Sequence, residues 1–149
     1  MWIAVLSSHR SKDPSTQVWA CIVDRDKKII WIWYNWFPTA CSDDEFPRDN
    51  DWDFYDKKNT YVVHAEANAI LNSFWWNIKW ATIYVVFFPC NECSKLIIQS
   101  GIKKVIYLSS KYKWWEQVYL ASKRMLESAW VAIHQCKPIQ KNIQISFDY

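Results

Sequence analysis

The stretch HAEANAILNSFWWNIKWATIYVVFFPCNECSKLIIQSG, residues 64–101, decides the fold of this chain. Residues 65–74 and 91–100 each predict a helix, because good helix formers follow one another there. Residues 82–88 between them form an apolar run that predicts a strand. A proline stands just before the second helix and a glycine just after it, which are typical start and stop signals. The stretch therefore predicts a helix, a strand and a second helix in succession.

Four residues with reactive side chains stand at the starts of these two helices, namely His64, Glu66, Cys90 and Cys93. One imidazole and two thiolates give zinc three protein ligands and leave a fourth position for water, as in catalytic rather than structural sites. The positive end of a helix also favours thiolate over thiol. The sequence thus predicts a Zn²⁺ site held by His64, Cys90 and Cys93. Glu66, two residues from a ligand, is the predicted group that transfers protons.

Each of the two motifs has a simpler explanation when it is taken alone. A Cys-x-x-Cys pair also occurs in redox centres and in zinc knuckles, and a His-x-Glu triplet arises by chance in many helices. Here both occur in order, with Pro89 before the first cysteine and an apolar strand leading into it. This combination favours one catalytic zinc site over a structural one.

Composition limits the classes of protein that fit. The chain has 149 residues and a net charge of +3, so we expect a single domain over 1–149 that suits nucleotide-sized substrates better than nucleic-acid duplexes. Cys21, Cys41 and Cys136 show no paired framework, which predicts a reducing, cytoplasmic location. No apolar run is long enough to cross a membrane and no signal peptide is recognisable, so no membrane partner is expected.

The remaining segments alternate between helices and strands. We expect an initial helix ending near His9, an acidic surface loop over 38–58, and a helix over 115–129 with Leu120 and Leu126 available for burial. The expected strands are 17–23, 28–34 and 104–108, followed by two short strands at the end of the chain. This alternation predicts an α/β sandwich with a mixed sheet.

The chain resembles the deoxycytidylate deaminases, and the pair of motifs His-x-Glu and Pro-Cys-x-x-Cys is the known signature of zinc nucleobase deaminases. Several further segments carry the resemblance: Arg10-Ser-Lys-Asp-Pro14, Ala20-Cys-Ile-Val23, Tyr34-Asn35, Cys41-Ser-Asp-Asp44 and Phe88-Pro-Cys-Asn-Glu-Cys-Ser-Lys-Leu-Ile-Ile98. The resemblance implies a three-layer α/β/α fold of the cytidine deaminase type, with a central mixed sheet of about five strands. It also implies hydrolysis of dCMP to dUMP and ammonia in deoxynucleotide metabolism. A further implication is a homo-oligomer, commonly a hexamer, that dCTP activates and dTTP inhibits.

The same resemblance implies roles for individual residues. The zinc ligands and Glu66 match those of the family. Asn35 would hydrogen-bond the deoxyribose, and the backbone of Ala65 would bind the pyrimidine carbonyl. Lys111 and Tyr112 fall where the family recruits groups near the substrate phosphate, although a solvent-facing lysine and a tyrosine at the rim explain them equally well.

The chain departs from the family in its use of glycine and tryptophan. It has one glycine and 12 tryptophans, whereas about 7% glycine is usual. Tryptophan stands at positions where the family pattern has glycine: Trp19, Trp31, Trp33, Trp36, Trp80 and Trp130. Glycine serves where φ is positive or where backbones approach closely, and an indole meets neither need without strain. We hypothesise that these residues replace glycine, through engineering or through transcription of the sequence; a naturally tryptophan-rich chain with repacked turns is the alternative.

The aromatic residues also allow a different class of function. Base stacking on indoles is typical of single-stranded nucleic-acid binding, so a nucleic-acid cytosine deaminase or a binding module is an alternative. The scattered basic residues and the alignment of aromatics with hydrophobic strands make nucleic acid the less favoured partner. A zinc-stabilised relative with impaired catalysis is the third possibility.

Overall fold

A computed structural model describes residues 1–13, 15–49, 53–73, 76–110 and 116–139. Its elements, in chain order, are α1 (Trp2–Ser8), β1 (Trp19–Val23), β2 (Ile29–Tyr34), α2 (Lys58–Tyr61), α3 (Ala65–Leu71), β3 (Thr82–Phe87), α4 (Asn91–Gln99), β4 (Lys104–Ser109), α5 (Glu116–Ser128) and β5 (Ala132–Gln135). The strands form one five-stranded sheet in the order β2-β1-β3-β4-β5. β1 runs antiparallel to β2 and β3, while β3, β4 and β5 are parallel to one another. The predicted mixed sheet is therefore confirmed.

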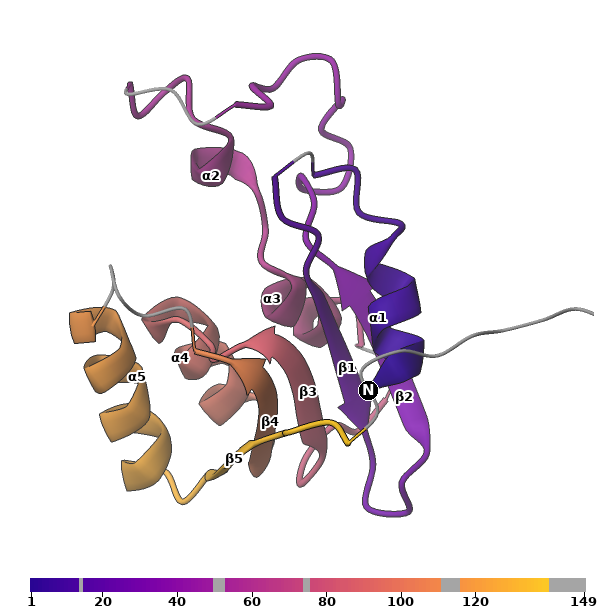
Figure 1. The fold of residues 1–149 in the computed structure, drawn as a ribbon, viewed down its shortest axis with the longest axis vertical. Helices are drawn as coiled ribbons and strands as arrows, with labels where there is room; N and C mark the ends of the chain where they lie inside the picture. The colour runs from indigo at the N-terminus through magenta and orange to yellow at the C-terminus, as the bar shows by residue number, and fades with distance from the viewer. Residues whose placement is uncertain (14, 50–52, 74–75, 111–115, 140–149) are drawn as a thin grey trace, which may run out of the picture.

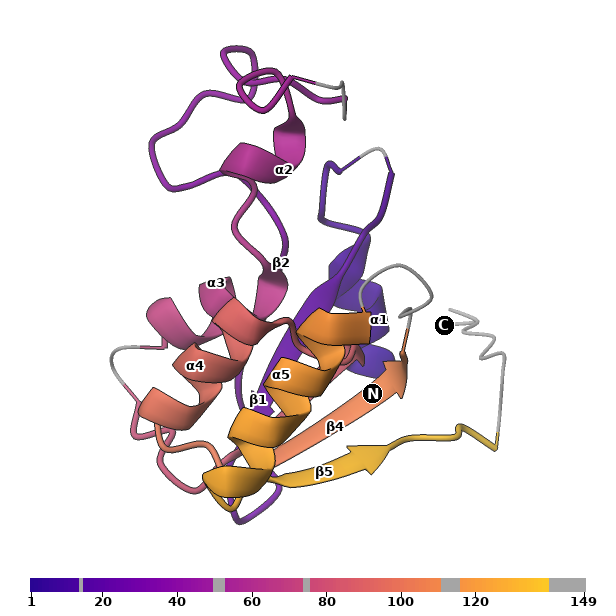
Figure 2. The same cartoon turned by 90° about the vertical axis from the view of Figure 1, so that its left-hand side faces the viewer.

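Helices cover both faces of this sheet. Figures 1 and 2 show α1 on one face and α3, α4 and α5 on the other. α4 and α5 share a face because each connects two parallel strands, and such crossovers are nearly always right-handed. The predicted three-layer α/β/α architecture is thereby confirmed. The segment that contains α2 extends beyond one end of the sheet in both views.

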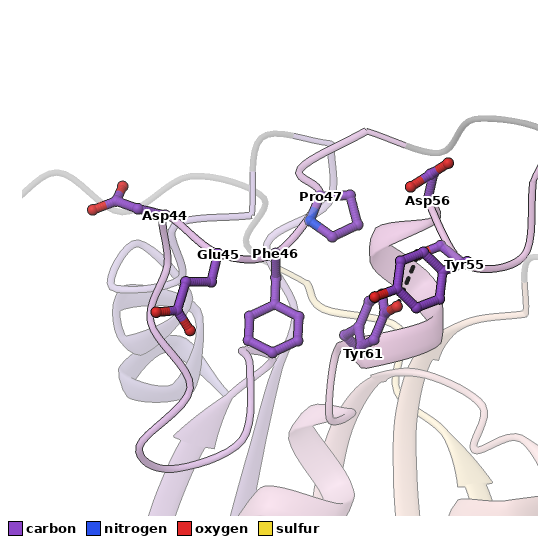
Figure 3. A pocket seen from close by; sticks show the side chains of 7 residues that line it. All are labelled: Asp44, Glu45, Phe46, Pro47, Tyr55, Asp56 and Tyr61. Carbon is purple, nitrogen blue, oxygen red and sulfur yellow. Dashed lines mark hydrogen bonds between the residues drawn. The ribbon is translucent and has the colours of Figure 1, made fainter.

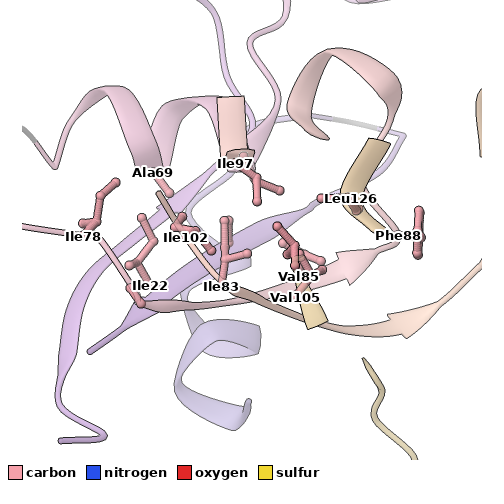
Figure 4. Close-up of a cluster of buried hydrophobic side chains, with 14 residues drawn as sticks. Ile22, Ala69, Ile78, Ile83, Val85, Phe88, Ile97, Ile102, Val105 and Leu126 are labelled. Carbon is pink, nitrogen blue, oxygen red and sulfur yellow. The ribbon is translucent and has the colours of Figure 1, made fainter. Parts of the chain in front are cut away.

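The two faces of the sheet bury different side chains, as the alternation along β1 illustrates. Ala20 and Ile22 point toward α3, α4 and α5, into the larger core cluster drawn in Figure 4. Trp19 and Cys21 point the other way and pack with Ala4 of α1. Since complete burial of a large aliphatic side chain contributes about 1.5 to 3 kcal/mol, the larger cluster is the main source of stability.

Three sequence-based expectations need correction or completion. Leu120 is 54% exposed, whereas Leu126 is fully buried, because the helical periodicity of α5 points Leu120 away from the sheet. The acidic loop ends in the short helix α2, which the sequence did not predict. Of the two strands expected at the end of the chain, one is β5; residues 140–149 lie outside the described part. No helix within the described residues is long and apolar enough to cross a bilayer.

Two of the unusual tryptophans have a backbone conformation typical of glycine. Trp80 and Trp130 have φ of 70° and 57°, in the left-handed region that costs an L-residue about 1 to 2 kcal/mol. Both side chains are exposed, at 49% and 87%. The other four tryptophans are not among the described residues with positive φ, and Trp19 is buried in the core. At Trp31 the misfit is different, because its buried indole N–H has no hydrogen-bond partner.

Candidate metal centre

The predicted zinc ligands meet where two helices begin. His64 is the N-cap residue of α3, and Cys90 is the N-cap residue of α4 with Cys93 one turn later. The Nδ1 atom of His64 lies 3.5 Å from Sγ of Cys90 and 3.4 Å from Sγ of Cys93. All three ligand atoms lie within 4.8 Å of one another. The structure thus brings the three predicted ligands together.

These distances fit a tetrahedral zinc ion. With Zn–S of about 2.3 Å and Zn–N of about 2.0 Å, a tetrahedral angle separates nitrogen from sulfur by about 3.5 Å. In the part of the chain that the structure describes, no other histidine, cysteine or acidic side chain joins the cluster. Cys93 is buried, Cys90 is half-buried and His64 is exposed, so one side of the cluster faces solvent. The donor set therefore fits zinc with an open coordination position.

The three ligands differ in charge before a metal binds. A hydrogen bond with the Cys93 side chain, together with one from His64, lowers the pKa of Cys90 to about 4. Sγ of Cys90 also accepts a bond from the backbone N–H of Cys93 at the start of α4. The hydrogen bond to Cys90 raises the pKa of His64 to about 9. Without metal, Cys90 is thus a thiolate at neutral pH, whereas the raised pKa values of His64 and Cys93 keep these two groups protonated, so zinc binding must displace their protons.

Glu66 lies in the first turn of α3, beside these ligands. Its side chain is buried, with 7% of the residue exposed. Burial raises the pKa of Glu66 above its ordinary value, although the charge of His64 acts in the opposite direction. A raised pKa makes a carboxylate a stronger base, which favours uptake of a proton from a nearby water. The position of Glu66 therefore suits proton transfer at the metal centre.

Two predicted substrate contacts lie in the described part. Ala65 is the first residue of α3 and is 1% exposed. Its N–H has no acceptor within the helix, because the first N–H groups of an α-helix lack an intrahelical partner. Asn35 follows β2 and is 7% exposed. Lys111 and Tyr112 lie outside the described residues.

The side-chain amide of Asn35 is surrounded by hydrogen-bond partners. Its Oδ1 accepts from the N–H of Val18 at 2.9 Å and from the Ser11 hydroxyl at 3.0 Å. Its Nδ2 donates to Oδ2 of Asp13 and to the carbonyl of Thr16, both at 3.1 Å. Asn35 therefore connects the end of β2 to the segment that leads into β1.

Sequence reasoning missed two residues of this network. Asp13 and Lys58 form an ion pair in which both side chains are almost completely buried. Asp13 belongs to the segment Arg10 to Pro14, which carries part of the family resemblance, and this could have indicated a role for Asp13. Nothing in the sequence distinguishes Lys58 from the other lysines, since its partner lies 45 positions away.

A surface pocket of about 400 Å³ lies in the acidic loop, away from the metal ligands. Figure 3 shows Phe46 and Tyr61 side by side in its lining, with ring centroids 4.9 Å apart. Its lining residues are Asp44, Glu45, Phe46, Pro47, Tyr55, Asp56 and Tyr61. Three carboxylates make this pocket unfavourable for an anionic ligand.

Comparison with known proteins identifies relatives for nearly the whole chain. Residues 1–109 match the family model described as the cytidine and deoxycytidylate deaminase zinc-binding region. A probable deoxycytidylate deaminase of Drosophila melanogaster is 50% identical over 99% of this chain and 75% of its own length. The deoxycytidylate deaminase of Homo sapiens is 46% identical over 99% of this chain and 83% of its own length.

A solved structure shows the same fold. The dCMP deaminase of the cyanophage S-TIM5, determined in complex with dCMP and dUMP, superposes with a TM-score of 0.71. The superposition covers 91% of this chain and 92% of the phage protein, at 24% sequence identity. The two proteins thus share one fold.

Proposed function

Because the chain belongs to the family of cytidine and deoxycytidylate deaminases, we propose that it hydrolyses dCMP to dUMP and ammonia. The observation that carries this proposal is the cluster of His64, Cys90 and Cys93 with Glu66 beside it. The high identity to deoxycytidylate deaminases over almost the whole chain supports dCMP as the substrate. The reaction consumes one water and replaces the amino group on the pyrimidine ring with oxygen.

His64, Cys90 and Cys93 would hold the metal, and their donor set and the family fit zinc. Zinc in such an open three-ligand site supplies a hydroxide nucleophile at neutral pH. Glu66 takes up the proton that the water loses and delivers it to the ring nitrogen. It then takes the proton of the new hydroxyl group on the ring carbon, which becomes the carbonyl of the product, and passes this proton to the departing amino group, which leaves as ammonia. Burial of Glu66 suits both steps, since it raises the pKa of the carboxyl group and so favours the protonated form that donates.

Substrate recognition in this proposal uses Ala65, Asn35, Lys111 and Tyr112. The free N–H of Ala65 binds the pyrimidine carbonyl, and Oδ1 of Asn35 accepts a hydrogen bond from the deoxyribose hydroxyl. The Ser11 hydroxyl lies 3.0 Å from Oδ1 of Asn35 and 3.0 Å from the backbone carbonyl of Asn35, and it has one proton to donate. When it donates to the backbone carbonyl, Oδ1 is available to accept a hydrogen bond from the sugar. Lys111 and Tyr112 contact the phosphate in this proposal.

The wider setting of the protein is also part of the proposal. Family membership supports a homo-oligomer, a hexamer, with dCTP as activator and dTTP as inhibitor in deoxynucleotide biosynthesis. The three cysteines outside the metal cluster, Cys21, Cys41 and Cys136, are free, which supports a reducing compartment, the cytoplasm. The acidic pocket over Asp44 to Tyr61 is not assigned to these effectors, since its carboxylates would repel a triphosphate.

The proposal is tested by measuring ammonia release from zinc-loaded protein. The substrates are dCMP, cytidine, dCTP and a cytosine-containing oligonucleotide, each at the same concentration. We expect dCMP to react with the highest kcat/KM. Turnover of another substrate in place of dCMP would overturn the substrate assignment and leave the zinc chemistry standing. Turnover of the oligonucleotide with steep salt dependence would favour a nucleic-acid deaminase instead.

A further inference from the structure

The ion pair between Asp13 and Lys58 is unusual because it is removed from water. Their side chains are 6% and 4% exposed, whereas every other ion pair in the described part has at least one side chain 45% or more exposed. Burying two charges costs several kcal/mol per ion, and apolar side chains of similar volume often stabilise a fold as well or better. A contribution to stability therefore does not explain why this buried ion pair is present.

The geometry of the pair is directed at Asn35. Oδ1 of Asp13 accepts from Nζ of Lys58 at 2.5 Å and from the backbone N–H of Ser15 and Thr16 at 2.8 and 3.0 Å. Its other oxygen, Oδ2, accepts from Nδ2 of Asn35 at 3.1 Å. Lys58 thus fixes the carboxylate that orients the Asn35 amide.

This contact decides which way the Asn35 amide faces. The opposite orientation would direct its Oδ1 at the Asp13 carboxylate and its NH₂ group at the N–H of Val18, which is repulsive on both sides. The observed orientation presents Oδ1 as the acceptor on the side of Val18 and Ser11. A charged carboxylate enforces this choice more strongly than a neutral acceptor does.

The pair also connects Asn35 to the metal centre. Trp36, the next residue, pairs with Val63 through two backbone hydrogen bonds of 3.2 and 2.8 Å. Val63 directly precedes the zinc ligand His64, and Lys58 lies in the short helix α2 just before it. Asp13 therefore accepts hydrogen bonds from both segments that the bridge joins, from Asn35 before Trp36 and from Lys58 before Val63.

We propose that Asp13 and Lys58 are positioning residues that set the orientation of Asn35 relative to the zinc site, and thereby the selection of a substrate sugar that carries a hydroxyl. This inference rests on the proposed function, in which Oδ1 of Asn35 accepts a hydrogen bond from deoxyribose. Neither residue takes part in the chemical step.

The test compares dCMP with its 3′-deoxy analogue, 2′,3′-dideoxycytidine monophosphate, which lacks the hydroxyl. We use Lys58→Met, Lys58→Arg and the double variant Asp13→Asn/Lys58→Met, which leaves no unpaired buried charge if the single variant does not fold. The matched control is Lys123→Met, which removes one partner of an exposed pair on α5. Each protein is checked for bound zinc before kcat and KM are measured.

The wild type and Lys123→Met should prefer dCMP. We expect Lys58→Met and the double variant to lose about tenfold in kcat/KM for dCMP, mainly through KM, and little for the analogue. Lys58→Arg should restore part of the preference because it keeps the charge. An equal loss on both substrates, or an unchanged preference, would overturn the proposal, since a purely structural pair predicts that outcome.

Hydrogen exchange separates this inference from the proposed function. If the wild type releases no ammonia from dCMP, the proposed function fails. The amides of Val18 and Trp36, which bond to Asn35 and Val63, should still exchange faster in Lys58→Met than in Lys123→Met. Unchanged exchange at both amides would overturn the positioning role independently of activity.

Discussion

Nδ1 of His64 lies 3.4 Å from Sγ of Cys93, although the two residues belong to the starts of different helices. The two helices share one face of the sheet, so their N-termini converge. Because zinc would join α3 to α4 at this point, the metal should contribute to folding as well as to chemistry. Removing zinc with a chelator should lower the unfolding temperature and abolish deamination. Added zinc should restore both, as calorimetry and ammonia release would show.

Cys93→Ser should weaken zinc binding. A serine hydroxyl is a much poorer zinc ligand than a thiolate, so the purified variant should contain less zinc by elemental analysis and unfold at lower temperature. Cys136→Ser is the control, because Cys136 is free and outside the cluster. Full zinc content in Cys93→Ser would contradict the ligand assignment.

Glu66→Gln should keep zinc but lose activity. Glutamine has nearly the same shape as glutamate and cannot exchange a proton, so kcat should fall by about 10² to 10⁴-fold with little change in metal content. The matched control is Glu92→Gln, which changes an exposed glutamate paired with Lys95 on α4. Wild-type activity in Glu66→Gln would exclude the proton-transfer role.

Asp13 should make the fold sensitive to acid. Burial alone would raise its pKa, but the hydrogen bonds from Lys58, Thr16 and Ser15 outweigh burial and lower the pKa below the ordinary value of 3.8. A carboxyl group with a lowered folded-state pKa stabilises the protein fully above its unfolded-state value, and this contribution is lost as the pH falls through the folded-state value.

The comparison of wild type with Asp13→Asn measures this contribution. Urea unfolding should show a large difference in unfolding free energy at pH 6, which shrinks as the pH falls below 3.8. A difference that stays constant over this range would show that the charge of Asp13 contributes nothing.

Replacement of two tryptophans by glycine should stabilise the protein. Trp130→Gly relieves left-handed strain at a residue that is 87% exposed, so we expect a gain of about 1 kcal/mol. Trp80→Gly should gain less, because the Trp80 ring lies 5.0 Å from the Arg25 guanidinium and 5.8 Å from Nζ of Lys103. Each such cation–π contact contributes about 0.5 to 1 kcal/mol at an exposed site.

Trp76→Gly is the control for these two variants. Trp76 is 58% exposed and is not among the described residues with positive φ, so glycine should not stabilise there. Thermal or urea unfolding of the three variants gives the comparison. Equal stabilisation at all three sites would point to loss of surface indole rather than to relief of backbone strain.

Intact mass measurement decides whether the tryptophans are real. A codon that one genetic code translates as glycine and another as tryptophan would give a chain with this composition. In that case the mass of the protein from its natural source should be lower than 17.9 kDa by a multiple of the tryptophan–glycine difference. A mass that agrees with the sequence would establish a naturally tryptophan-rich chain.

The metal centre could be predicted from the sequence because its signals are local. Both pairs of functional residues lie within one helical turn, and the caps and apolar runs around them fix the helix starts and β3. The Asp13–Lys58 pair could not be predicted, because two irregular segments bring it together and neither has a periodic pattern. Leu120 was assigned wrongly because the apolar positions of α5 do not define a single face.

The Trp36–Val63 bridge has a consequence for how this family can vary. This bridge closes the loop segment of residues 37–62, which contains the acidic pocket. The two ends of the segment are therefore held together next to His64. The entropic cost of closing such a loop rises only with the logarithm of the number of residues in it. Insertions or deletions in this segment that leave Lys58 in place should therefore be tolerated, and evolution can rebuild the rest of the segment while the metal ligands stay unchanged.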